Sequence, residues 1–235
     1  MKKLSISKAL KEAMDEEMER DEKVIIMGLD VGAYGGAFAA TQGLYDKYGE
    51  DRVMDMPISE AGYVGAAIGA AATNLRPVAE LQFSDWITIA SDQLVNQGAK
   101  MRYMFGGELS IPMVLRAPVG GYISAAAQHS QMFESWFAFV PGLKVVLPST
   151  PADAKGLLKS AIRDDNPVVF FEHKNNYERE GEVPEDPEYI IPLGEADVKR
   201  EGEDVTIVTY SLILHKALQP AEKLDEEGIG TEVIE

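Results

Sequence analysis

The stretch Asp55-Met-Pro-Ile-Ser-Glu-Ala-Gly-Tyr-Val-Gly-Ala-Ala-Ile-Gly69 decides how this chain folds. The short apolar run from Arg52 to Met56 is typical of a buried strand, and Pro57 prevents that strand from continuing. Ser59 is a residue type that caps helices, so a helix is expected from Ala61 to Asn74. Gly, Ala and other small apolar residues dominate this helix, which therefore allows another backbone to approach closely.

Glu60 stands at the junction between the expected strand and the expected helix. It lies in the first turn of an otherwise uncharged helix, where the helix dipole favours a carboxylate. One interpretation is that Glu60 interacts only with the helix N-terminus. The other is that the junction keeps one carboxylate in a water-poor cleft for a chosen partner. The local sequence leaves both open.

The composition excludes several classes of protein. The 235 residues include 22 Lys and Arg against 39 Asp and Glu, a net charge of −17, which argues against a nucleic-acid surface or a polybasic membrane anchor. The absence of cysteine excludes disulfides, thiolate metal sites and a cysteine nucleophile. No apolar run approaches the ~20 residues of a membrane span, and no apolar core follows Met1-Lys-Lys, so we expect a cytoplasmic protein.

Short apolar runs alternate with helical patterns along the first three quarters of the chain. Strands are expected at 24–27, 52–56, 77–81, 112–116, 144–147 and 167–171, and helices at 7–20, 38–48, 61–74, 85–105, 132–139 and 150–163. Within 85–105, the expected inward positions are Trp86, Ile89, Ala90, Leu94 and Met101. This alternation predicts an α/β fold with three layers, in which a parallel sheet has helices on both faces.

The composition changes at about Lys174. Residues 174–204 contain three prolines among many acidic residues and are expected to form an exposed connector. Residues 205–235 predict one βαβ unit, which is too small to bury a core alone. We therefore expect a first domain over 1–173, a connector over 174–204 and the incomplete start of a second α/β domain over 205–235.

His129 carries the strongest functional signal among the three histidines. It lies in a loop rich in Gly, Ala, Ser and Gln, expected at the carboxyl edge of the sheet, where it could act as an acid or base. His173 and His215 fit ordinary structural roles. Trp86 is either a stacking surface or a core aromatic. The glycine-rich loop from Gly28 to Gly36 lacks the spacing of a dinucleotide fingerprint or a P-loop.

A set of short motifs runs through the whole chain. They are Asp-Glu-Glu-Met (15–18), Asp30-Val-Gly, Tyr34-Gly-Gly, Pro57-Ile-Ser-Glu-Ala-Gly62, Asp92-Gln-Leu-Val-Asn96, Ala99-Lys-Met-Arg-Tyr103, Gln128-His-Ser-Gln131, Pro141-Gly-Leu-Lys-Val-Val146, Ala154-Lys-Gly-Leu-Leu158 and Asp165-Asn-Pro-Val168. In this order, the motifs resemble the β subunits of the thiamine-diphosphate-dependent 2-oxo acid dehydrogenases, the pyruvate and branched-chain decarboxylating components. The resemblance implies the pyrimidine-binding domain of the transketolase-like fold.

The resemblance implies catalytic roles for two residues. Glu60 matches the glutamate that hydrogen-bonds N1′ of the cofactor's aminopyrimidine and so favours the imino tautomer. General acid–base help of this kind is worth ~10²–10⁴ in rate. His129 matches a histidine that faces the substrate and the incoming lipoyl group.

The same resemblance implies binding roles for a second group of residues. Ile58, Gln82 and Trp86 match the lining of the pyrimidine pocket, with Trp86 where the family has Phe or Tyr. A potassium site in relatives is matched by the backbone carbonyls of Met113, Ala161, Asp164 and Asn166.

Two departures from the family pattern stand out. Leu29 replaces the glutamate that the family usually has in Gly-Glu-Asp-Val, and the motif Gly-Asp-Gly followed by an Asn pair is absent. That motif binds the cofactor's diphosphate through magnesium, and in relatives it lies on a separate α subunit. The resemblance therefore implies a partner α subunit, in an assembly of two α with two β, and a lipoyl-bearing acyltransferase core.

The sequence thus predicts a β subunit that decarboxylates a 2-oxo acid and acylates a lipoyl group together with an α subunit. Within this family, Gln82 favours the branched-chain members over the pyruvate members. Two alternatives remain open at this stage. One is an acetoin dehydrogenase β subunit, which cleaves a hydroxyketone with a similar chain. The other is a scaffold that keeps the fold without chemistry, for which Leu29 argues and against which Glu60 and His129 argue.

Overall fold

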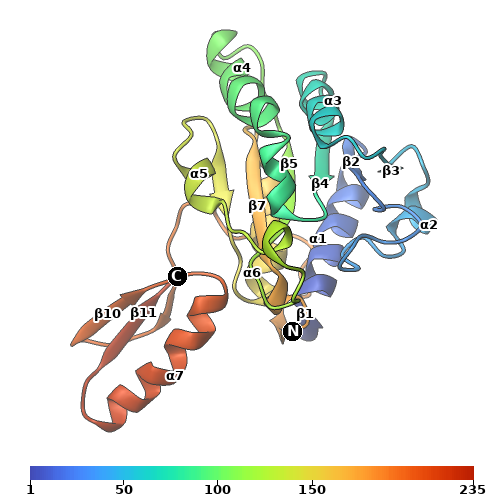
Figure 1. Ribbon diagram of the computed structural model, residues 1–235. Coiled ribbons are helices and arrows are strands. Elements are labelled where there is room, and N and C mark those ends of the chain that lie inside the picture. Colours follow the sequence, from blue (N-terminus) through green and yellow to red (C-terminus); the bar gives the residue numbers. More distant parts are fainter.

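A computed structural model describes residues 1–235 and shows a central six-stranded sheet flanked by helices (Figure 1). All strand pairs in this sheet are parallel, and the strand order is β3-β2-β4-β5-β7-β6. The strands are β2 (Val24–Gly28), β3 (Val53–Asp55), β4 (Arg76–Glu80), β5 (Val114–Val119), β6 (Lys144–Val146) and β7 (Val168–His173). The predicted α/β fold with a parallel sheet is therefore confirmed.

Helices cover both faces of the sheet, and each face has its own core. Helices α1 (Ile6–Arg20) and α6 (Pro151–Arg163) pack on one face in a cluster of 22 buried residues. Helices α3 (Glu60–Ala72) and α4 (Ala99–Met104) lie on the other side, where α3 contributes to a cluster of 21. Side chains of a strand point alternately to the two faces, so each buried strand contributes to both clusters.

Two predicted helices are shorter or less regular than expected. The helix expected over 38–48 is reduced to α2 (Leu44–Tyr48), because Ala39 and Gly43 adopt positive φ angles of 58° and 81° that end any regular helix before it. The helix expected over 132–139 is reduced to α5 (Glu134–Ala138).

The expected helix over 85–105 is interrupted. It divides into a 3₁₀ segment, η1 (Ser84–Thr88), a π-helical segment, η2 (Gln93–Gly98), and α4. Ala90 and Leu94 are buried as predicted, whereas Ile89 is 54% exposed, because the break after η1 turns it outward. The prediction of Ile89 as an inward position was therefore wrong.

The N-terminus forms a strand that the sequence did not suggest. β1 (Lys2–Ser5) pairs antiparallel with β8 (Glu180–Val183), and Ser5 caps α1 by accepting a hydrogen bond from the backbone N–H of Lys8. Both strands are largely polar, so neither shows the apolar run that identified the others. Residues 174–204, expected as an exposed connector, thus contain η4 (Lys174–Asn176), β8 and β9 (Val198–Arg200).

A small second unit follows. β10 (Val205–Val208) and β11 (Thr231–Ile234) are parallel and joined by α7 (Leu212–Glu226), which confirms the predicted βαβ unit, and β9 adds an antiparallel strand. Figure 1 shows this unit at the lower left, with α7 to the right of its strands. No helix combines the length and apolar character needed to cross a membrane. The expected domain boundaries stay a prediction.

A buried ionic network joins the three central strands. The guanidinium of Arg116 on β5 is 1% exposed and binds both carboxylate oxygens of Glu172 on β7, at 2.6 and 2.8 Å. It also binds Glu80 on β4 at 2.5 Å. Tyr177 donates its hydroxyl to Glu172 at 2.6 Å. Burial raises the pKa of Glu80, and the charge of Arg116 opposes that shift.

This network predicts a large effect of one substitution. Arg116→Met should lower the free energy of unfolding by ~3–5 kcal/mol, because it leaves two carboxylates buried without a cation. Urea unfolding at neutral pH measures the change. The control is Arg102→Met on the exposed part of α4, expected to change stability by less than ~0.5 kcal/mol. Equal losses in the two variants would contradict the importance of the network.

Candidate active site

The candidate site lies at the carboxyl edge of the parallel sheet. Three chain segments leave the central strands there: η1 after β4, the loop 120–131 after β5, and η4 after β7. Ligands of open α/β sheets bind outside the carboxyl ends of the strands. The charged network around Arg116 lies directly beneath this edge.

Glu60 is placed by the break between β3 and α3. It is the first residue of α3, only 8% exposed, and no hydrogen bond or ion pair involves its carboxylate. Ser59 occupies the N-cap position, but its side chain makes no capping bond, contrary to the expectation. Burial raises the pKa of Tyr63, one turn along α3, and the charges of Glu60 and Glu80 raise it further.

An unpartnered, largely buried carboxylate fits the cofactor that the sequence implies. Burial of a charge is unfavourable unless it is paired, and the dipole of α3 offsets only part of that penalty. A ring nitrogen of an aminopyrimidine is a suitable partner because it can donate to a carboxylate or share its proton. The contact of Glu60 with the pyrimidine ring of thiamine diphosphate stays a prediction.

The other expected pocket residues lie in two separate places. Ile58 is 80% exposed beside Glu60, which is unusual for so large an apolar side chain. Gln82 instead donates its side-chain amide to Asp30 at 3.0 Å, in the loop that also contains the half-buried Leu29. No hydrogen bond links either Gln82 or Ile58 to Glu60.

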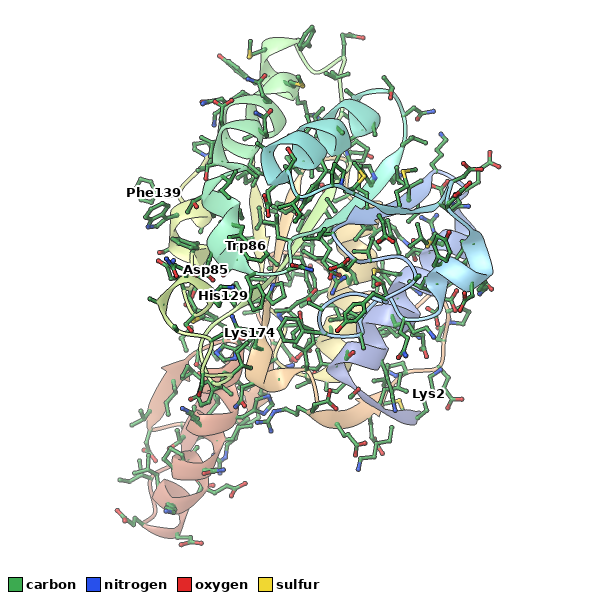
Figure 2. The ribbon with its side chains drawn as sticks, turned by 45° about the vertical axis from the view of Figure 1, so that its right-hand side comes forward. Lys2, Asp85, Trp86, His129, Phe139 and Lys174 are labelled. Carbon is green, nitrogen blue, oxygen red and sulfur yellow. The ribbon has the colours of Figure 1, made fainter.

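His129 lies in an aromatic group together with Trp86. Its imidazole is edge-on to the ring of Phe83, with ring centroids 4.5 Å apart, and to Trp86, at 5.6 Å. Phe83 and Trp86 are themselves 5.3 Å apart. Figure 2 shows Trp86 and His129 along the same side of the molecule. The structure thus brings two of the predicted residues together, and no hydrogen bond or aromatic contact links them to Glu60.

Three residues that the sequence analysis missed hold the loop of His129. Lys174 donates to the backbone carbonyl of His129 at 2.5 Å, and Asp85 accepts from the side-chain amide of Gln131 at 2.8 Å. Ser84 donates to the carbonyl of Gln131 at 3.0 Å. A usable signal was present, because Asp85 and Lys174 are charged residues close behind buried strands, where polar groups gather in parallel sheets.

The four residues expected to bind potassium gather at the opposite edge of the sheet. The carbonyl of Met113 accepts from the N–H of Val168 at 2.9 Å, and that of Ala161 from Asp164 at 3.3 Å. The carbonyl of Asp164 accepts from the guanidinium of Arg76 at 3.2 Å, which already places a positive charge there. The assignment of potassium to these residues and Asn166 stays a prediction.

Comparisons with known proteins show the family of this chain. Residues 2–180 match the family model "Transketolase, pyrimidine binding domain", and residues 194–235 match "Transketolase, C-terminal domain". The chain is 52% identical over 236 residues to "2-oxoisovalerate dehydrogenase subunit beta" of Bacillus subtilis, which covers 100% of this chain and 72% of the relative. The chain belongs to the transketolase-like β subunits of the thiamine-diphosphate-dependent 2-oxo acid dehydrogenase family.

Two other relatives of this β subunit have names that state different activities. It is 54% identical over 244 residues to "Acetoin:2,6-dichlorophenolindophenol oxidoreductase subunit beta" of Cupriavidus necator, covering 100% of this chain and 72% of the relative. It is 48% identical to "Pyruvate dehydrogenase E1 component subunit beta, mitochondrial" of Dictyostelium discoideum, and the match covers 99% of this chain and 66% of the relative. The solved "Split gene transketolase, inactive beta4 tetramer" has the same fold, with a TM-score of 0.78 at 22% identity, covering 98% of this chain and 71% of that one.

His173 supports the site of this β subunit from below. It ends β7, is 6% exposed, and accepts a hydrogen bond at Nδ1 from the N–H of Asn175. Gly120, where the loop of His129 begins, has a φ of 84°, and a Cβ there would lie 2.3 Å from Nε2 of His173. Burial, together with the charges of Lys174 and Lys216, lowers the pKa of His173 to about 4.

The lowered pKa of His173 predicts a pH dependence of stability. The unfolded chain takes up this proton near pH ~6.5, and the folded chain only near pH 4. The contribution of neutral His173 to the free energy of unfolding is therefore fully present above pH ~6.5 and is lost as the pH falls towards 4. Urea unfolding between pH 7 and 5 should show a shallower decline for His173→Asn than for the native chain. Parallel pH profiles would contradict the prediction.

Proposed function

We propose that this chain is the β subunit of a 2-oxo acid dehydrogenase, which decarboxylates a 2-oxo acid oxidatively and transfers the acyl group to a lipoyl group. The observation that carries the proposal is Glu60, a largely buried carboxylate with no partner in the chain, at the start of a small-residue helix. The carboxylate oxygens of Glu60 are not among the fully buried atoms, so a bound ligand can reach them.

We assign a separate role in the reaction to each predicted site residue of this chain. When bound, thiamine diphosphate would supply a nucleophilic thiazolium carbon for the decarboxylation. Glu60 would hold the pyrimidine ring by hydrogen-bonding N1′ and so favour the tautomer whose exocyclic nitrogen can accept a proton. Trp86 and Ile58 offer apolar surface to the ring. His129, next to Trp86 and half-exposed, would orient the substrate and exchange a proton with the incoming lipoyl group.

The remaining parts of the catalytic centre would come from a partner. The chain has no Gly-Asp-Gly motif, and no group of three or more His, Asp or Glu residues is arranged to hold a metal ion. An α subunit would therefore hold magnesium and the diphosphate, in an assembly of two α with two β chains bound to a lipoyl-bearing acyltransferase core. A cytoplasmic location and a structural potassium ion are further parts of this proposal.

Two classes of substrate are candidates. Identity to the 2-oxoisovalerate and pyruvate relatives favours a 2-oxo acid, whereas 54% identity to the Cupriavidus relative favours the hydroxyketone acetoin. Assay of the reconstituted α–β complex with dichlorophenolindophenol as electron acceptor decides between them. Reduction with pyruvate or a branched-chain 2-oxo acid but not acetoin supports the first, and the reverse result supports the second.

A substitution of Glu60 tests the central residue. In the reconstituted complex, Glu60→Gln should slow proton exchange at C2 of the bound cofactor ~10²–10⁴-fold, because the amide cannot share a proton with N1′. Exchange is measured by deuterium incorporation followed by acid quench and NMR. The control Glu108→Gln, between α4 and β5, should leave exchange unchanged. An unchanged exchange rate in Glu60→Gln would sink the assignment and favour the scaffold.

A substitution of His129 tests the second residue. His129→Ala should reduce acyl transfer to a lipoyl domain more than decarboxylation, because the histidine lies apart from Glu60. The two half-reactions are measured with lipoyl domain and with dichlorophenolindophenol as acceptors. Equal losses in both would show that His129 only supports the fold of its loop.

A further inference from the structure

Lys174 is buried in an unusual setting for a lysine. It is 5% exposed, and its ammonium makes one hydrogen bond, to the carbonyl of His129. The same ammonium lies 5.0 Å from the centroid of Phe83, the ring against which the imidazole of His129 packs. One buried cation therefore contacts both the backbone of His129 and the ring that supports its side chain.

Asp85 supplies the opposite charge. It is 5% exposed, and its Oδ1 accepts from both the side-chain amide and the backbone N–H of Gln131, at 2.8 and 3.4 Å. Its Oδ2 is buried and has no hydrogen-bond partner. Burial lowers the pKa of Lys174, and the charge of Asp85 opposes that shift. Asp85 thus acts on Lys174 through its charge, without an ion pair between the two side chains.

Lys174 and Asp85 each make a hydrogen bond to the loop of His129. Lys174 holds position 129 from η4, directly after β7, and Asp85 holds position 131 from η1. The rest of the loop is poorly suited to hold its own shape, because Tyr122, Ser124 and Ala126 all have positive φ angles. Figure 2 shows Asp85, His129 and Lys174 following one another along the same side of the molecule.

We propose that Lys174 is a positioning residue for His129, and that Asp85 balances its charge and fixes the adjoining Gln131. The pair keeps the imidazole edge-on to Phe83 and Trp86, ready for the half-reaction that uses His129. This inference rests on the proposed function for its kinetic consequence, but the placement of the imidazole can be measured without activity. Misplacement of a reacting group by about 1 Å can reduce a rate ~10²-fold.

The kinetic test uses the reconstituted complex. Lys174→Met should lower acyl transfer to a lipoyl domain about tenfold or more relative to decarboxylation with dichlorophenolindophenol. Lys174→Arg, which keeps a cation and donors, should recover part of that loss. The matched control is Lys155→Met, because Lys155 is also buried and also donates to a backbone carbonyl, that of Pro184, but packs between α1 and α6. Lys155→Met should reduce stability and leave the ratio of the half-reactions unchanged.

A double variant separates positioning from charge balance. Lys174→Met leaves Asp85 buried and uncompensated, so the single variant should unfold at lower urea concentration than the native chain. Adding Asp85→Asn should restore much of the stability, and acyl transfer should remain low. If the double variant restores acyl transfer as well, or if Lys174→Met leaves the ratio of half-reactions unchanged, Lys174 is a structural residue and the inference is wrong.

An NMR measurement keeps the inference separate from the proposed function. In the full chain labelled at histidine, the ring resonances of His129 are assigned by their loss in His129→Gln. Lys174→Met with Asp85→Asn should shift them, and Lys155→Met should not. If the complex has no activity with any 2-oxo acid or acetoin, the proposed function fails, and these shifts still decide the positioning role. Unmoved resonances would overturn it.

Discussion

The ionic contact of Arg116 with Glu80 and Glu172 is the constraint on which the carboxyl edge of the sheet depends. Each of the three residues lies in a different strand, and the three strands are neighbours. A guanidinium has a fixed planar geometry, so it satisfies both carboxylates only when the strands keep their register. The segments that leave these strands, η1, the loop of His129 and η4, therefore start from fixed positions.

This dependence explains why the site is built in layers. Below lies a fully buried charged network, in which the donors of Arg116 meet acceptors on both neighbouring strands. Above it, the single charges of Lys174 and Asp85 hold loop backbone and a loop amide. The aromatic rings around His129 form the outermost layer. Each layer limits the freedom of the one above it, which suits a site whose reacting groups must be oriented before the substrate arrives.

Glu60 depends on a different feature, the break between β3 and α3 at the edge of the sheet. Its carboxylate is separate from the His129 group, and no contact within the chain joins the two. A substitution at one of these residues therefore leaves the side-chain contacts of the other in place. The exposed Ile58 and the small side chains of α3 leave room for a further molecule on the side of Glu60.

The sequence by itself determined the α/β class, the parallel sheet and the family. These follow from apolar periodicity and from motifs in a fixed order, all of which are local. It also singled out Glu60 and His129, because each is a polar residue in an unusual local setting. Only the tertiary structure decided how 85–105 divides into η1, η2 and α4, that polar β1 pairs with β8, and that Lys174, Asp85 and Arg116 are buried. Those outcomes depend on partners as far apart in the chain as Lys2 and Val183. The sequence around a charged residue does not show whether its partner will be water or another side chain.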